Sequence, residues 1–207
     1  MNEEHSKSKS LLSSLGWLIG AVAAVILVQA FLARPFVIPS GSMLPTLKPG
    51  DRILVGRLGA LWHTPERGQI AVFRPPAGAV LDEPKCGDGG GLYTQQICTK
   101  TWGGQAQDVF FVKRIVALEG DRVSLRSGHL ILNGKPADEP YVHSLCGDPA
   151  RCDFPQTVQV PQGQVLMLGD NRGDSDDGRF WGTVPKDWIV GPMIASWWPI
   201  SRAHLGQ

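Results

Sequence analysis

The sequence predicts a mainly β protein, with one N-terminal membrane-spanning helix followed by an antiparallel β domain of two lobes. Residues 11–33 form an uncharged run of 23 residues. Beyond it, apolar runs are short, rich in β-branched and aromatic residues, and separated by Gly, Pro and Asp, which is typical of strands. No segment after residue 34 shows a long apolar period of 3.6 residues. We therefore expect a tail at 1–10, an anchor at 11–33 and a folded domain at 34–207.

The run LLSSLGWLIGAVAAVILVQAFLA has the length of a membrane span. As a helix rising 1.5 Å per residue it would be about 34 Å long, against about 30 Å for a hydrocarbon core. A cleavable signal peptide is the alternative, because Lys7 and Lys9 precede the run. The run is longer than a usual signal-peptide core, and no clean A-x-A site separates it from Arg34, which favours an uncleaved anchor. The lysines place the N-terminus in the cytoplasm and the domain outside it.

The order of the domain follows from its short apolar runs. Turn residues such as Asn133 and Gly134 separate several of them, as in β-hairpins. Residues from about 117 to 165 read as a hairpin-rich lobe between two strands that carry motifs. We expect strands at 52–55, 69–73, 109–116, 122–125, 129–132 and 164–168.

Charge and cysteine usage narrow the function classes. The formal net charge is +1 and the basic residues are dispersed, so a nucleic-acid partner is not expected. Four cysteines in two local pairs, Cys86 with Cys98 and Cys146 with Cys152, favour two disulfides in an oxidising compartment. Four cysteines allow three connectivities, so this pairing is a hypothesis. A zinc site is the alternative, but neither pair has zinc-ligand spacing, and we expect no metal and no cofactor.

Two distant segments carry the candidate chemistry. Residues 39–47, PSGSMLPTL, form a turn-prone stretch with Ser40 and Ser42. Lys113 lies in an apolar strand, where alternation puts it on the same face as Phe111 and Ile115. Burial disfavours the ammonium, and lowering the pKa from about 10.4 to near 7 corresponds to about 4–5 kcal/mol. Such a lysine can act as a base toward a serine hydroxyl, whereas a guanidinium cannot.

Each segment also has a structural interpretation. Ser40 and Ser42 can cap or turn the chain. Lys113 can extend from a strand edge to solvent or pair with an acid. No plausible Ser-His-Asp set is found in the sequence, which leaves the serine segment and Lys113 as complementary parts of one site.

Five segments of the chain, in order, match a known family. They are PSGSMLPTL (39–47), GDRILV (50–55), RGQIAVF (67–73), FVKRIVALEGD (111–121) and GDNRGDSDDGRF (169–180). Together with the anchor they resemble the boxes of bacterial type I signal peptidases. Departures from the pattern are Gln69, Gly173, Gly178 and the cysteine-bounded insertion at 86–98.

The resemblance implies a membrane-bound serine endopeptidase that removes signal peptides from exported preproteins after small-x-small sites. It implies the two-lobed β fold of these enzymes and a plasma-membrane location with the catalytic domain on the extracytoplasmic side. We also expect a monomer, although the sequence does not determine the oligomeric state. Its partners would be preproteins and the lipid bilayer. The alternatives are a narrow-substrate Ser/Lys processing peptidase of the conjugation or repressor type, and a catalytically silent membrane-tethered β module that binds a partner.

Matched residue by residue, the resemblance makes Ser42 the nucleophile and Lys113 its general base. The Ser40 hydroxyl and the Ser42 N–H would form the oxyanion hole, and Ser175 would orient the lysine. The supporting polar network would comprise Asp170, Arg172, Asp177 and Arg179. The residues expected to line the substrate pockets are Phe36, Ile38, Pro39, Met43, Leu47, Phe111 and Val112.

Overall fold

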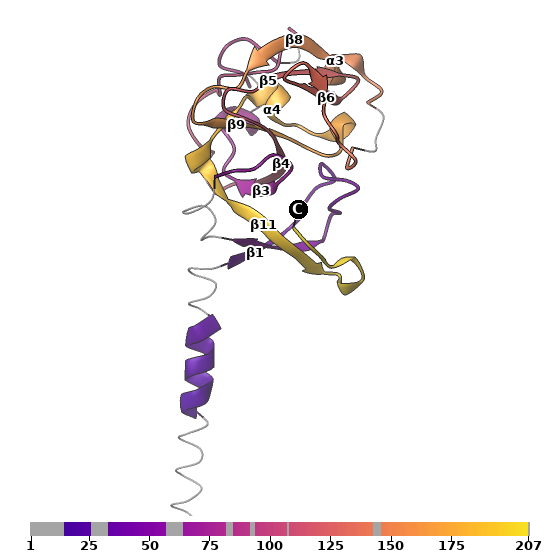
Figure 1. Cartoon of the computed structure of the whole chain (residues 1–207). Coiled ribbons are helices and arrows are strands. Elements are labelled where there is room, and N and C mark those ends of the chain that lie inside the picture. The colour runs from indigo at the N-terminus through magenta and orange to yellow at the C-terminus, as the bar shows by residue number, and fades with distance from the viewer. Residues whose placement is uncertain are drawn as a thin grey trace, which may run out of the picture.

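Two antiparallel sheets make up the β domain (Figure 1). The computed structural model describes residues 15–25, 33–56, 64–81, 85–91, 94–106, 108–142 and 146–206. All strand pairs within both sheets are antiparallel. The predicted mainly β fold is confirmed.

The larger sheet carries the strands expected to bear the motifs. Its order is β1-β2-β11-β3-β4-β9-β10, with β12 added beside β11. β11 pairs with β3 over its first part and with β2 over its second, so it joins the two halves of the sheet. The strands are β1 (Ala33–Val37), β2 (Arg52–Gly56), β3 (Ile70–Phe73), β4 (Phe111–Leu118), β9 (Gln164–Leu168), β10 (Val184–Pro185), β11 (Ile189–Trp198) and β12 (His204–Leu205).

The smaller sheet forms the second lobe, at the place in the chain where the sequence predicts it. Its order is β7-β6-β5-β8, and its strands are β5 (Arg122–Arg126), β6 (His129–Leu132), β7 (Lys135–Pro136) and β8 (Phe154–Gln159). Asn133 and Gly134, between β6 and β7, both have positive φ, as a tight hairpin turn requires. Short helices complete the fold: η1 (Ala77–Ala79), α3 (Pro149–Cys152), η2 (Arg172–Asp174), α4 (Gly178–Trp181), η3 (Lys186–Trp188) and η4 (Ile200–Arg202).

β3 separates two apolar clusters by simple strand alternation. Ile70 and Val72 face a smaller cluster that also holds Met43 and Leu47 of the serine segment. Ala71 and Phe73 face the larger cluster, which extends from β4 and β9 into β5, β6 and β8. The two lobes therefore share one core, and the serine segment is packed against the opposite face of β3.

The expected strand bounds hold closely in most places. The expected strand at 109–116 is β4, which begins two residues later and continues to Leu118. Six strands were not among those expected: β1, β7, β8, β10, β11 and β12. In β11, Gly191 and Pro192 interrupt the apolar pattern, and the pairing with β3 shifts register at this point.

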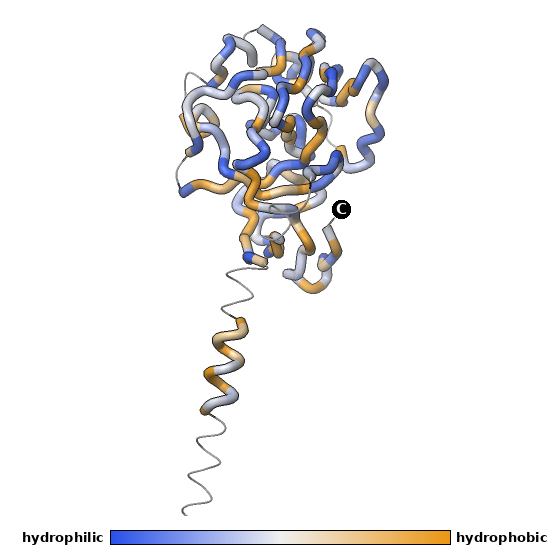
Figure 2. Tube along the Cα trace, turned by 60° about the vertical axis from the view of Figure 1, so that its left-hand side comes forward, coloured by the Kyte–Doolittle hydropathy of each residue, from blue (hydrophilic) through white to orange (hydrophobic). Residues whose placement is uncertain are grey.

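The expected anchor at 11–33 lies only in part within the described residues. Residues 15–25 are helical and Ala33 already begins β1, one residue before the expected boundary, whereas 11–14 and 26–32 lie outside the described residues. Figure 2 shows that the helix of 15–25 is largely apolar. Among the described residues, no helix is both long enough and apolar enough to span a membrane.

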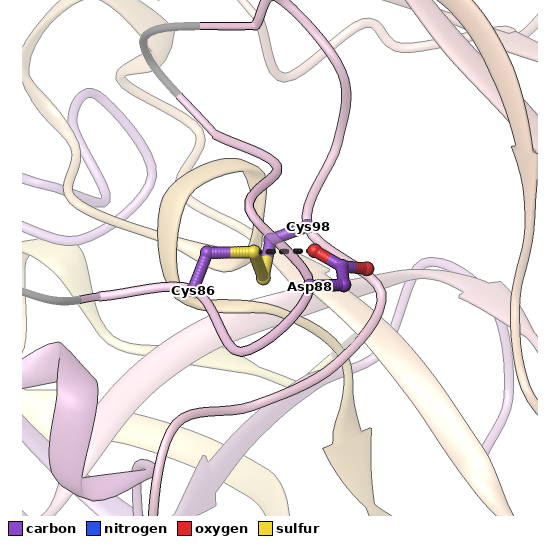
Figure 3. A group of neighbouring side chains, drawn as sticks. All are labelled: Cys86, Asp88 and Cys98. Carbon is purple, nitrogen blue, oxygen red and sulfur yellow. Dashed lines mark hydrogen bonds between the residues drawn. A yellow bond between two sulfur atoms is a disulfide. The ribbon is translucent and has the colours of Figure 1, made fainter.

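Both expected disulfides are present, Cys86–Cys98 and Cys146–Cys152. Asp88 lies beside the first (Figure 3), and its carboxylate accepts hydrogen bonds from Gly90 N–H and from the N–H and hydroxyl of Thr99. Burial raises the pKa of Asp88, but these hydrogen bonds outweigh it and hold the pKa below its ordinary value. Cys86, Asp88 and Cys98 are close enough together for a metal site. The two cysteine sulfurs, however, are bonded to each other and cannot bind a metal as thiolates.

Candidate active site

The serine segment is a compact turn between β1 and β2. Met43 and Leu47 are buried in the smaller cluster, and Leu47 N–H donates to Met43 O at 2.9 Å. Ser42 is half-buried and Ser40 is exposed, and the two hydroxyl oxygens lie 3.4 Å apart in a hydrogen bond donated by Ser40. Two apolar side chains thus fix the turn, while its hydroxyls stay accessible.

The segment 169–180, called the box below, forms hydrogen bonds to this turn although it lies near the other end of the chain. Asn171 N–H donates to Ser42 O at 3.1 Å, and the Asn171 side-chain amide donates to Gly41 O at 3.1 Å. The Thr46 hydroxyl donates to Asp170 at 2.6 Å. The backbone on both sides of Ser42 is therefore held by residues more than 120 positions away in sequence.

Lys113 is the third residue of β4 and is almost fully buried. It pairs in register with Ala71, and Phe111 pairs with Phe73, so these residues share the face that covers the larger core cluster. The predicted placement of Lys113 on an apolar face with Phe111 and Ile115 is confirmed.

Burial lowers the pKa of Lys113 to about 8. Asp177, Asp176 and Asp170 oppose this by favouring the ammonium, while Arg179 adds to the lowering. The three carboxylates therefore return to the ammonium part of the stabilisation that burial removes. At pH 7 about a tenth of such lysines are neutral, against far fewer than one in a thousand for an exposed lysine.

Asp170 is the centre of a buried ion pair. Arg114, the neighbour of Lys113 on β4, donates to it through two nitrogens at 2.8 and 2.7 Å. Both side chains are at most 3% exposed. A bidentate pair of this kind is geometrically specific, so it fixes the 169–171 turn relative to β4.

Asp177 and Arg179 form a second buried pair. Asp177 accepts from Gly169 N–H at 3.0 Å and from Arg179 Nε at 2.8 Å. Burial raises the pKa of Asp177, but Arg179 and then Lys113 favour the carboxylate and hold the pKa below its usual value. Asp177 therefore stays ionised near Lys113. The hydrogen bond that it accepts from Gly169 N–H also links it to the first residue of the segment 169–180.

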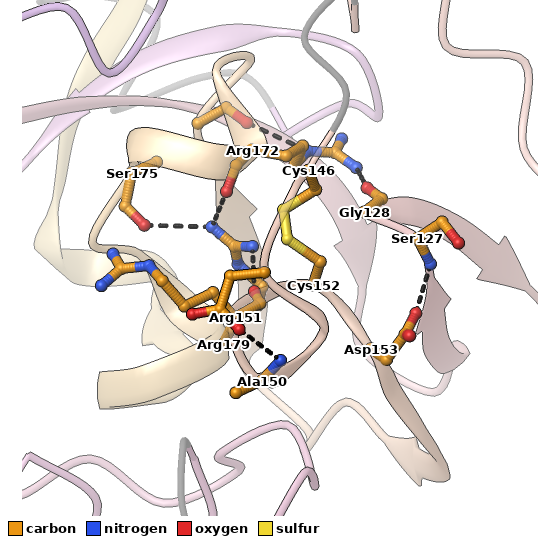
Figure 4. Close-up of a disulfide and its surroundings, with 12 residues drawn as sticks. Ser127, Gly128, Cys146, Ala150, Arg151, Cys152, Asp153, Arg172, Ser175 and Arg179 are labelled. Atoms are coloured by element: carbon orange, nitrogen blue, oxygen red, sulfur yellow. Dashed lines mark hydrogen bonds between the residues drawn. A yellow bond between two sulfur atoms is a disulfide. The ribbon is translucent and has the colours of Figure 1, made fainter.

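Ser175 is fully buried, and its backbone carbonyl accepts from Arg179 Nη2 at 3.0 Å (Figure 4). Its hydroxyl has no hydrogen-bond partner among the described residues. A Cβ built on Gly169 would overlap this hydroxyl and lie 2.5 Å from Ser42 O. Ser175 and the carbonyl of Ser42 thus both lie where a side chain of residue 169 would project, and the buried Ser175 hydroxyl is left available for a donor or an acceptor.

Arg172 binds residues of the second lobe. It donates to Gly128 O (Figure 4). It also donates to Gly169 O at 3.0 Å and to Glu139 at 2.5 Å. Arg172 and Glu139 are each at most 1% exposed. All four residues of the expected polar network are therefore buried and bonded, in pairs that the sequence does not reveal.

The expected pocket residues divide by exposure. Phe36, Pro39, Phe111 and Val112 are at least partly open to solvent, and the Phe36 ring meets Phe110 edge-on at 5.4 Å between centroids. The other three are 3% exposed or less and pack in the smaller cluster: Ile38, Met43 and Leu47.

Several residues of the site were missed from the sequence. Thr46, Arg114 and Asn171 lie inside the motifs already quoted, so their neighbours were the available signal. Glu139 and Tyr141 lie outside every motif, in the loop after β7. Nothing in their local pattern indicates a link to the box.

Comparison with protein families identifies the class of molecule. The family described as "Signal peptidase, peptidase S26" matches residues 11–198. The chain belongs to this family and is a serine-type endopeptidase that acts on signal peptides. The alternatives of a narrow-substrate processing peptidase and a silent binding module are not favoured.

Individual relatives agree. The chain is 36% identical to the probable signal peptidase I-1 of Synechocystis over 191 residues. The matched region covers 92% of this chain and 84% of that protein. It is 32% identical to signal peptidase IB of Staphylococcus aureus, covering 91% of each. Thylakoidal processing peptidase 1 of Arabidopsis thaliana is 36% identical over 88% of this chain and 47% of its own length.

Proposed function

We propose that Ser42 and Lys113 form the catalytic dyad with which this enzyme cleaves signal peptides from preproteins. The observation that carries the proposal is the buried Lys113, whose lowered pKa supplies a neutral amine in a domain where a serine turn is held rigidly at its carbonyl groups. A serine hydroxyl becomes nucleophilic only beside such a base.

The steps follow from these positions. Lys113 Nζ takes the proton of the Ser42 hydroxyl as its oxygen attacks the scissile carbonyl, giving a tetrahedral oxyanion. The Ser40 hydroxyl and the Ser42 N–H donate to that oxyanion. The Lys113 ammonium then gives its proton to the leaving amine, and the neutral lysine activates a water that hydrolyses the acyl-enzyme. Ser175 orients Lys113 in this scheme.

We further propose that the reaction takes place at a membrane surface, on the extracytoplasmic side, with residues 11–33 as the anchor. Support comes from an apolar tip at the end of the domain where β1 and the C-terminus lie (Figure 1). This C-terminal tip exposes Ile194, Trp197, Trp198, Ile200 and Leu205, with exposed fractions from 42% to 78%. Contiguous exposed apolar residues with tryptophans suit the bilayer interface.

The substrate would lie extended beside the open ends of β1 and β4, with its small residues against Phe36, Pro39, Phe111 and Val112. Main-chain pairing to a strand edge gives affinity with little side-chain demand. Side chains larger than alanine would collide with these rings.

The test is cleavage of a preprotein by the detergent-solubilised full chain. Ser42→Ala and Lys113→Ala are expected to lower kcat by at least about 10⁴-fold, and Ser40→Ala by about 10²-fold or more. Lys135→Ala, which changes an exposed lysine of β7, serves as the matched control and keeps full activity. Full activity in either Ser42→Ala or Lys113→Ala would disprove the dyad.

A further inference from the structure

The loop after β7 contacts two arginines of the candidate active site. Glu139 and Tyr141 belong to this loop, and the Tyr141 hydroxyl donates to Glu139 at 3.3 Å. Glu139 is buried and also accepts from Leu130 N–H of β6 at 2.9 Å, which ties the loop to the second lobe. We call residues 139–141 the loop arm.

Each arm residue holds one arginine. Glu139 accepts two hydrogen bonds from Arg172, at 2.5 and 3.3 Å. The ring of Tyr141 lies against the guanidinium of Arg114, 3.9 Å from its central carbon to the ring centroid. This is a close cation–π contact, and stacking leaves the guanidinium edge free for its bidentate bond to Asp170.

The two arginines hold the same turn. Arg114 binds the Asp170 carboxylate, and Arg172 donates to Gly169 O. The next residue, Asn171, binds the carbonyl groups of Gly41 and Ser42. A continuous set of contacts therefore runs from the loop arm through two arginines to the backbone of Ser42.

We propose that the loop arm is a positioning element of the active site, in which Glu139 and Tyr141 set the place of Ser42 through Arg172 and Arg114. The proposal rests on the proposed function of Ser42. It gives the second lobe a role in the reaction, through contacts that pass to Ser42 by way of the two arginines.

The energetics favour positioning over simple stabilisation. Burying Arg172 and Glu139 removes two charges from water, and such pairs are often no more stabilising than apolar side chains of the same volume. Arg172 also donates hydrogen bonds to two backbone carbonyl groups, those of Gly169 and Gly128. A set of directed bonds fixes distances and angles, which an apolar contact does not do.

The decisive variants are Tyr141→Leu and Tyr141→Phe. Leucine removes the ring from Arg114, while phenylalanine keeps the ring and loses only the 3.3 Å hydrogen bond to Glu139. Tyr141 is half-buried, so neither change opens a large cavity in the core. Glu139→Gln is the second probe, since it keeps the shape and removes the charge that pairs with Arg172.

Two readouts separate positioning from folding. With a preprotein substrate, Tyr141→Leu is expected to lower kcat about tenfold with KM changed less than twofold, and Tyr141→Phe to restore kcat to within twofold of wild type. Hydrogen exchange in peptides covering 169–175 is expected to speed up in Tyr141→Leu and Glu139→Gln, while exchange in β9 stays unchanged.

The exchange readout does not depend on catalysis. If the wild-type chain does not cleave a preprotein, the proposed function fails, while faster exchange at 169–175 still supports the coupling of the arm to the turn. Unchanged exchange in both variants overturns the inference. So does a Tyr141→Leu enzyme with wild-type kcat, or a Tyr141→Phe enzyme as slow as Tyr141→Leu.

Discussion

Lys113 is buried among groups of both charges. Burial favours its neutral amine, whereas Asp177 and Asp176 favour its ammonium. The result is a pKa of about 8, between that of an exposed lysine and the neutral range. Lowering the pKa from 10.5 to about 8 means that the ammonium is disfavoured by about 3 kcal/mol relative to an exposed lysine. Without these acids the pKa of Lys113 would be lower, so a larger fraction of the lysine would be neutral at pH 7. The domain would then be less stable, because the remaining ammonium would be buried without carboxylates near it.

This pKa sets an expected pH profile. Because the free enzyme needs neutral Lys113, kcat/KM should rise about tenfold per pH unit below pH 7, pass its half-maximal value near pH 8 and level off above pH 9. Initial rates with a preprotein substrate in one mixed buffer at constant ionic strength measure it. A profile that is flat from pH 6 to 9 would contradict a lysine base.

At the scale of elements, strand alternation was enough to place Lys113. The pattern of β4 predicted which face carries Phe111, Lys113 and Ile115, because alternation depends only on neighbours in sequence. The partners of the box were not predictable in this way. Arg172 binds Glu139, 33 residues away, and Arg114 binds Asp170, 56 residues away, and neither pairing leaves a local pattern. β11 was missed for the opposite reason, since Gly191 and Pro192 imitate a turn inside a strand.

Gly169 links the end of β9 to the box and has no room for a side chain. A Cβ there would lie 2.5 Å from Ser42 O and 2.6 Å from Ser175 Cβ. Gly169→Ala is therefore expected to displace the serine turn and lower kcat/KM at least about a hundredfold. Gly147→Ala is the control, because a Cβ at Gly147 meets nothing within 4 Å. Equal cleavage rates in the two variants would show that the turn tolerates displacement.

At the scale of the whole molecule, the shared core holds the two lobes together, whereas the apolar tip is exposed. The larger cluster joins both sheets, so the lobes are packed as one body around the box. The C-terminal tip, by contrast, keeps Ile200 and Leu205 more than three-quarters exposed. Exposed apolar side chains of this size add no stability to the domain in water, and the membrane contact proposed above would cover them.

The tip leads to a prediction that depends on the substrate's setting. Ile200→Glu together with Leu205→Glu should lower cleavage of a preprotein reconstituted with the enzyme in vesicles several-fold, because the charges oppose contact with the bilayer interior. Cleavage of a soluble peptide in detergent should stay unchanged. A control double variant at two exposed polar positions, Gln95→Glu and Lys135→Glu, should leave both rates unchanged. Equal rates for tip variant and control in vesicles would argue against membrane contact.

The hydrogen bond between Thr46 and Asp170 joins residues 124 positions apart. Its consequence concerns timing during biosynthesis. A growing chain that ends at β8 contains the serine turn but lacks Gly169, Asp170 and Asn171, so the hydrogen bonds to Thr46, Gly41 and Ser42 cannot yet form. We therefore expect the proposed dyad to become active only after the segment 169–171 has been synthesised.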